Sequence, residues 1–161
     1  MSLSAAQALE VGDIYYFDKS TSKDLDPDKL PIGLVYWVND AKDYALVMAL
    51  PQPTDMNLTT AQAQCNNYEP LGTAKGDWHL PNLIEAMHMV SQKWNSIVDN
   101  KFTVLNDKLG KVTTGQVLKN SYYWTTSYNY YWKVNPSTGD FSYDTTTSNN
   151  RSVRCVTIIS K

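Results

Sequence analysis

Three runs of apolar residues in the first third of the chain predict an antiparallel sheet. They are Ile14–Phe17, Ile32–Val38 and Tyr44–Leu50, and the last two are continuous enough to be buried in part on both faces. The five residues Asn39–Asp43 between them predict a hairpin loop. The polar segment Thr21–Lys29, with its Asp-Pro-Asp sequence, predicts a surface loop.

Helical patterns follow in the middle of the chain. Either residue of the pair Thr59–Thr60 can cap a short helix that carries Cys65 on its last turn. Asn82 and Glu85 form a capping-box sequence at the start of a second helix. The helical spacing predicts one long apolar stripe facing the sheet, made of Leu83, Met87, Val90, Trp94 and Ile97. Residues 101–120 are weakly patterned, with a helical turn expected near Leu105–Leu109.

The segment from Ser121 to Asn150 is rich in a few residue types. Ser, Thr, Asn, Asp and Tyr fill all but seven of its 30 positions. So little aliphatic surface is typical of disorder. Tyr and Trp, however, give the large, stiff contact area that binding loops use. We therefore interpret the segment as an ordered binding surface, with an ordinary polar β-meander as the alternative.

Short strands are predicted within and after this segment. Tyr131–Val134 and Asp140–Tyr143 are joined by the turn-forming residues Asn135–Gly139. The apolar run Ser152–Ile159 predicts a buried closing strand. A tyrosine-rich hairpin is thus expected between Trp124 and a hydrophobic last strand.

Length and charge exclude several classes of protein. The 161 residues fit a single domain, 1–161. The net charge of −2 lacks the basic stripe of a nucleic-acid binder. No apolar run is long enough to insert into a membrane, and no signal peptide is visible. The protein is expected in the cytoplasm, or at a cell surface or in a virion if a leader was removed or the gene is viral; its oligomeric state is not predicted.

The two cysteines, Cys65 and Cys155, lie 90 positions apart, which excludes a CxxC or four-ligand zinc pattern. By chain entropy alone, a disulfide between them would contribute roughly 4–5 kcal/mol. Two free buried thiols are typical of a cytoplasmic protein. The spacing leaves both alternatives open.

No catalytic or cofactor motif is recognisable. The chain lacks the Gly-x-Ser-x-Gly elbow and the glycine-rich phosphate-binding loops. We interpret His79 and His88 as structural or surface residues and Glu85 as a helix cap. Arg151 or Arg154 is expected to pair with a carboxylate. We therefore expect a non-enzymatic protein without a metal or cofactor.

Three segments carry a resemblance to a known family. They are Gly76–Glu85 (GDWHLPNLIE), Tyr123–Ser127 (YWTTS) and Ser152–Val156 (SVRCV). Together they resemble the bacterial C-type-lectin-like domain family known from the C-terminal domain of collagen-like surface adhesins, with His79 where that family has Arg. The resemblance implies an α+β fold with two helices packed on twisted antiparallel sheets, neighbouring chain ends, and a helix cysteine that can meet the last-strand cysteine. The Glu-Pro-Asn and Trp-Asn-Asp sequences of calcium-dependent lectins are absent, so it implies no calcium site.

A narrower resemblance is to the variable proteins of diversity-generating retroelements. In these, a C-type-lectin fold displays residues mutated at adenines of Asn codons, and the composition of residues 121–150 resembles that outcome. The resemblance implies that Trp124, Trp132, Val134, Gly139 and Phe141 are scaffold. It places the ligand surface at Tyr122, Ser127, Tyr128, Asn129, Tyr130, Tyr131, Lys133, Asn135, Asp140, Ser142, Tyr143, Asp144, Thr145 and Ser148.

These observations predict a receptor-recognition domain of bacterial or phage origin. An aromatic, nearly uncharged patch suits a protein ligand. The alternative is a carbohydrate-binding adhesin tip, with Asn129, Asp140 and Asp144 holding sugar hydroxyls. Behind these two come an enzyme with a cleft containing His79 and Glu85, and a structural subunit of a fibre.

Overall fold

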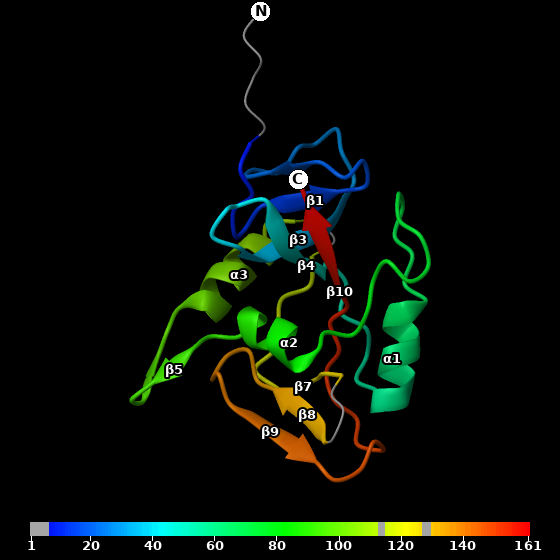
Figure 1. Ribbon diagram of the computed structural model, residues 1–161, viewed down its shortest axis with the longest axis vertical. Coiled ribbons are helices and arrows are strands. Elements are labelled where there is room, and N and C mark those ends of the chain that lie inside the picture. The colour runs from blue at the N-terminus through cyan, green and yellow to red at the C-terminus, as the bar shows by residue number, and fades with distance from the viewer. Residues whose placement is uncertain (1–6, 113–114, 127–129) are drawn as a thin grey trace, which may run out of the picture.

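A five-stranded antiparallel sheet is the largest element of the structure (Figure 1). The structure, a computed structural model, describes residues 7–112, 115–126 and 130–161. The strand order is β10-β4-β3-β1-β2, with β1 at Ile14–Tyr16, β2 at Thr21–Ser22, β3 at Pro31–Val38, β4 at Tyr44–Ala49 and β10 at Val156–Ser160. The three predicted strands and their hairpin are confirmed, and the expected loop after β1 begins with the short strand β2. The closing strand is confirmed in part: it begins at Val156 rather than Ser152, and Ile158 in it is 45% exposed rather than buried.

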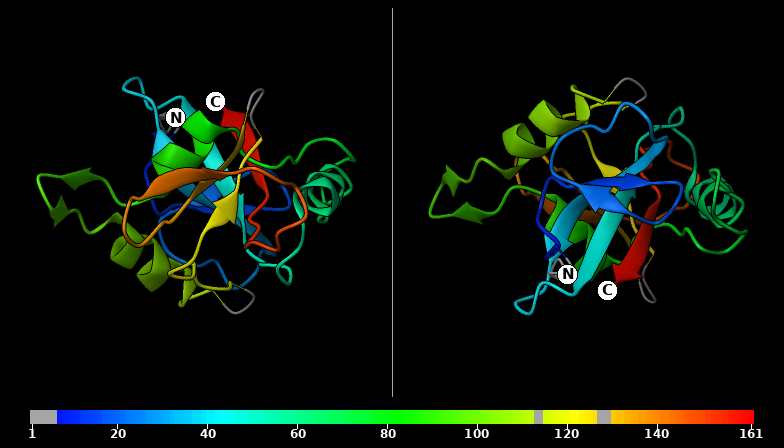
Figure 2. Two further views of the ribbon diagram at one scale, coloured as in Figure 1. Left: turned by 90° about the horizontal axis from the view of Figure 1, so that it is seen from below. Right: turned by 90° about the horizontal axis from the view of Figure 1, so that it is seen from above.

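Both faces of this sheet are buried, as the continuous apolar runs predict. Leu34 and Met48 belong to a core cluster with residues of α2 (Leu83–Met89) and α3 (Lys101–Leu109). The neighbouring Val35 and Val47 belong to a second cluster, with residues of α1 (Leu58–Asn66). Successive side chains of β3 and β4 point to opposite faces of the sheet, and each face packs on its own cluster. The helices α1 and α3 therefore lie on opposite sides of the sheet (Figure 2). The fold is mixed α+β with antiparallel sheets, and three helices occur in the described residues rather than two.

The two predicted caps have different outcomes. Asn57, not the pair Thr59–Thr60, caps α1, because its side chain accepts a hydrogen bond from the Thr60 amide at 2.9 Å. Cys65 lies on the last turn of α1, as predicted. The capping box at α2 is confirmed, with reciprocal hydrogen bonds between Asn82 and Glu85 of 2.8 and 2.9 Å.

The predicted apolar stripe of α2 is wrong beyond Val90. The helix ends at Met89, and the chain continues into a hairpin of β5 (Lys93–Trp94) and β6 (Ile97–Val98). Asn95 and Ser96 both have positive φ, 47° and 69°, the conformation of the two-residue turns that join antiparallel strands. The hairpin leaves Trp94 78% and Ile97 72% exposed. In contrast, the helical turn expected near Leu105 extends into a complete helix, α3.

A three-stranded sheet lies at the end of the molecule opposite β1 and β2, and the segments that carry the family resemblance meet beside it (Figure 1). It has the order β7-β8-β9, with β7 at Tyr123–Trp124, β8 at Tyr131–Val134 and β9 at Phe141–Asp144. Isolated bridges join its surroundings to the other segments: His79 with Val156, Asn82 with Thr126, and Tyr123 with Ser152. The three sequence segments are therefore in direct contact.

A disulfide and a hydrogen bond close the molecule. Cys65 of α1 is bonded to Cys155, which precedes β10, so the disulfide alternative is the one that the structure shows. Lys161 donates its Nζ to the carbonyl of Gln7, so the two ends of the described chain adjoin.

Arg154 and Arg151 use different partners. The guanidinium of Arg154 is buried and donates to the backbone carbonyls of Ala49, Leu50 and Gln116. Burial lowers the pKa of Arg154 to about 10. Arg151 makes the expected carboxylate pair, which belongs to the site described next.

Candidate functional site

The register of the β8–β9 hairpin fixes which side chains share a face. The cross-strand pairs are Trp132 with Tyr143, Val134 with Phe141, Tyr131 with Asp144, and Lys133 with Ser142. Successive side chains of a strand point to opposite faces, and cross-strand partners point to the same one. The first two pairs therefore form one face of the hairpin and the last two pairs form the other.

Exposed rings dominate the first of these faces. We define the aromatic face as Tyr130, Trp132, Phe141 and Tyr143. Tyr130 and Phe141 are each 54% exposed and Tyr143 is 49% exposed, while Trp132 is half-buried. Ring centroids lie 4.7 Å apart for Tyr130 and Tyr143, 5.3 Å for Trp132 and Tyr143, and 6.1 Å for Trp132 and Phe141. Rings at these separations attract one another, so the cluster is held in place while much of its surface is open to solvent.

The opposite face carries a buried network of charges. Asp144 is 8% exposed and pairs with Lys133, which is equally buried, and with Arg151 through contacts of 3.0 and 3.2 Å. The Lys133 ammonium also lies 5.0 Å from the centroid of the Tyr122 ring, within cation–π range. Burial alone would raise the pKa of Asp144, but the hydrogen bonds from Arg151 and Lys133 outweigh it, and the pKa is lowered.

The turn between β8 and β9 is built by backbone and amide hydrogen bonds. The Asn135 amide donates to the carbonyl of Asp140 at 2.8 Å, and the Asn135 side chain accepts from the Ser137 amide at 2.9 Å. Gly139 has φ of 76°, and a Cβ there would lie 2.3 Å from the carbonyl oxygen of Ser91. The turn is therefore packed closely against the segment that leads into β5.

β7 anchors the hairpin to the core. Trp124 is fully buried and donates its indole N–H to the carbonyl of Met56 at 2.9 Å. The backbone and side chain of Thr125 both donate to the carbonyl of Trp132, at 3.1 and 3.0 Å. The aromatic face therefore stands on a fixed support.

The predicted ligand residues are distributed over several environments. Those with exposed side chains are Tyr130, Tyr131, Tyr143, Thr145 and Ser148. Those of intermediate exposure are Tyr122, Asp140 and Ser142. Three are buried, namely Lys133, Asn135 and Asp144. Ser127, Tyr128 and Asn129 lie outside the described residues.

Five residues differ from their predicted roles. Lys133 and Asp144 are paired inside the molecule and Asn135 builds the turn, so these three side chains are unsuited to direct ligand contact. Phe141 and Trp132 were both predicted as scaffold and belong to the aromatic face, where Phe141 is largely exposed and Trp132 is half-buried. The two-residue alternation of Phe141 and Tyr143 in one strand is the signal that could have placed them together.

His79 and Glu85 form a pair beside a small hollow. The His79 Nε2 lies 2.9 and 3.0 Å from the two carboxylate oxygens of Glu85, which also caps α2. Burial alone would raise the pKa of Glu85, but the hydrogen bonds from His79 and from the Asn82 amide lower it. A hollow of about 250 Å³ is lined by Gln62, Asn66, His79, Leu80 and Thr126, and Glu85 does not line it.

His88 is a packing residue. Its ring stacks on that of Trp37 with centroids 4.6 Å apart. Burial and the nearby Lys101 ammonium lower the pKa of His88. Within residues 7–112, 115–126 and 130–161, no group of three or more His, Cys, Asp or Glu side chains could hold a metal ion. In the same ranges, no helix is both long and apolar enough to cross a membrane.

No protein-family model matches this chain, and no characterised protein matches it in sequence.

Proposed function

We propose that this protein is a non-enzymatic recognition domain that binds a protein ligand through its aromatic face. The observation that carries the proposal is the cluster of Tyr130, Trp132, Phe141 and Tyr143, which is open to solvent and ordered by ring contacts. Exposed aromatic residues on a rigid support are the usual anchors of protein interfaces, because little entropy is lost when they are covered.

The support beneath the rings favours binding over chemistry. The buried charges beneath the hairpin are paired with one another, since Asp144 is shared by Lys133 and Arg151. Glu85 is likewise committed to its helix cap and to His79. We therefore infer binding rather than catalysis.

The C-type-lectin-like fold is part of the proposal. The three segments on which the resemblance rests contact one another through backbone bridges, as parts of one structural unit would. His79 pairs with Glu85 although it stands in place of the family's Arg. Both observations support the resemblance. A diversified Ser121–Asn150 segment follows from the same proposal, and its first test is a search of the locus for a near-repeat of this coding region beside a reverse transcriptase gene.

A screen followed by substitution tests the ligand surface. The purified domain is screened against a panel of bacterial surface proteins and against a glycan array. For the ligand that is found, we expect the double variant Phe141→Ser/Tyr143→Ser to weaken binding by at least about 30-fold, the loss typical of one interface hot spot. The double variant also removes all three ring contacts of the cluster, each worth about 0.5–1.5 kcal/mol, so the free energy of unfolding should fall by about 2–4 kcal/mol. Affinity is therefore compared at a temperature where the variant still shows a complete folded baseline.

Leu71→Ser is the matched control, because Leu71 is 63% exposed on a different part of the surface and should not affect binding. Unchanged affinity in the double variant would refute the aromatic face as the site. Binding to glycans alone would replace the protein ligand by a carbohydrate.

A further inference from the structure

β10 is an edge strand whose outer side is only partly paired. The Cys155 carbonyl accepts from Ala49 and the Lys161 amide donates to Asp43, so alternate residues of β10 bond inward to β4 and its continuation. Val156 bonds outward instead, exchanging two hydrogen bonds of 2.9 Å with His79. By the same alternation, the amide and carbonyl of Ile158 and Ser160 point outward. Neither residue has a backbone partner among the described residues on that side.

The segment that pairs with Val156 turns away from β10 at this point. Gly76 has φ of 91° and Gly72 has φ of 84°. At Gly72 a Cβ would lie 2.0 Å from the carbonyl oxygen of Phe17, so this part of the loop is packed against the residue that follows β1. This departure leaves a pocket of about 320 Å³ along the open part of the edge.

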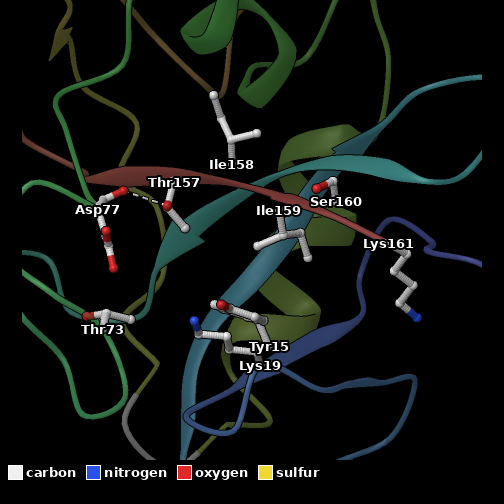
Figure 3. A pocket seen from close by; sticks show the side chains of 9 residues that line it. All are labelled: Tyr15, Lys19, Thr73, Asp77, Thr157, Ile158, Ile159, Ser160 and Lys161. Atoms are coloured by element: carbon white, nitrogen blue, oxygen red, sulfur yellow. Dashed lines mark hydrogen bonds between the residues drawn. The ribbon is translucent and has the colours of Figure 1, made fainter.

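Figure 3 shows the residues that line the pocket. The side chains of Thr157 and Ile159 point to the same side of β10, toward Tyr15 and Lys19, whereas Ile158 points to the other side (Figure 3). Thr157 donates its hydroxyl to the carbonyl of Asp77 at 2.6 Å. Since Ile158 lines the pocket although its side chain points away, its backbone contributes to the wall.

The side chains that line the pocket carry two ammonium groups and one carboxylate. Lys19 is exposed and forms no ion pair within the described ranges. Lys161 is the second ammonium group, and Asp77 is the one carboxylate among the lining residues. Asp77 already accepts a hydrogen bond from the Ala74 amide at 2.8 Å.

We propose that the outer edge of β10 binds an extended peptide that bears an acidic side chain. Two outward amides and two outward carbonyls in alternation match the backbone of an added strand. A residue opposite Ile159 would project its side chain to the same side as Ile159, into the pocket. A carboxylate there would meet Lys19.

This peptide site is independent of the aromatic face. The end of β10 and the β8–β9 hairpin lie at opposite ends of the molecule in Figure 1. An experiment can therefore refute the peptide site on β10 without refuting ligand binding at the aromatic face.

The test titrates the protein with the acetylated and amidated peptide Thr-Val-Thr-Glu-Thr-Val-Thr. In NMR spectra we expect the amides of Ile158 and Ser160 to shift more than other amides. Ser160→Pro removes one outward donor and leaves the inward bonds to β4 intact. It should weaken binding at least about fivefold, which corresponds to one backbone hydrogen bond. Ser160→Ala keeps the donor and should bind within about twofold of the wild type.

Two further measurements separate the backbone and charge parts of the proposal. Replacing Glu by Gln in the peptide should weaken binding to the wild type but not to Lys19→Gln. N-methylation of alternate peptide residues should abolish binding in one register and not in the other, which tests strand addition even if Ser160→Pro fails to fold. The proposal is overturned if the peptide does not bind at millimolar concentration or if N-methylation has no effect. A dimer of the free protein that Ser160→Pro dissociates would also overturn it, because a second copy would then occupy the edge.

Discussion

Asp144 is the residue on which the underside of the hairpin depends. It is the partner of two cations, and one of them, Lys133, is as buried as Asp144 itself. A buried ion pair gives little net stability, but removing one member leaves the other charge without compensation. Residues that composition alone assigned to ligand contact therefore hold the aromatic face in position.

We expect Asp144→Asn to lower the free energy of unfolding by about 3 kcal/mol, because Lys133 would stay buried without a counter-charge. Asp140→Asn is the matched control. Its partner Lys93 lies 3.4 Å away at the surface, so the loss should not exceed about 1 kcal/mol. Urea unfolding measures both. Equal losses in the two variants would contradict the assigned role of Asp144.

The buried carboxylate of Asp144 predicts that the free energy of unfolding depends on pH below about pH 4. The folded pKa of Asp144 is lowered, so the unfolded chain takes up this proton first. Its contribution is complete above the unfolded pKa of about 3.9 and is lost as pH falls through the lower folded value. Below pH 4 the free energy of unfolding should therefore decrease less steeply for Asp144→Asn than for the wild type.

At the scale of elements, the central strands were predictable and the β5–β6 hairpin was not. β3 and β4 are continuous apolar runs that a sheet buried on both sides requires. Trp94 and Ile97 fit a helical stripe equally well on spacing alone. The turn requires a left-handed backbone at both Asn95 and Ser96. Asn favours this conformation but Ser does not, so the pair is a weaker hairpin signal than Asn-Gly.

The hairpin was predictable, but the exposure of its side chains was not. The pattern of residues 131–143 predicted a tyrosine-rich hairpin, which the structure has as β8 and β9, and ligand binding by this hairpin stays a prediction. The pattern could not separate Tyr143, which is exposed, from Asp144, which is buried, because the face of each residue depends on register and on Arg151 from a distant segment.

The β5–β6 turn gives a prediction at this scale. Ser96→Gly should relieve the cost of a left-handed non-glycine residue, about 1 kcal/mol. The gain is local, so protection of the Asp99 amide, which donates to Gln92 across the base of the hairpin, should rise about fivefold in hydrogen exchange. Ser148→Gly, at an exposed residue without positive φ, should give no such rise. Unchanged Asp99 protection in Ser96→Gly would contradict the turn assignment.

At the scale of the whole molecule, the chain is closed by links that join distant segments. The Cys65–Cys155 disulfide connects α1 to the start of β10, and the His79–Val156 bridge lies immediately beyond it. β10 therefore joins the second core cluster to the edge where we place the peptide. The aromatic face is supported by β7, and Trp124 of β7 lies in the same core cluster as both cysteines.

We expect this disulfide to stabilise the fold without shaping the aromatic face. It spans 90 residues, so chain entropy predicts a loss of about 4.5 kcal/mol when both cysteines are reduced. Urea unfolding of the wild type with and without reductant measures this loss with no change of side chain.

The double variant Cys65→Ala/Cys155→Ala should lose somewhat more free energy of unfolding, because both sulfurs are buried and their removal leaves a cavity. Ligand affinity at the aromatic face should be unchanged wherever the variant is folded. A loss below about 1 kcal/mol on reduction would show that the reduced unfolded chain is already constrained, and a selective loss of ligand affinity would show that the two ends of the molecule are coupled.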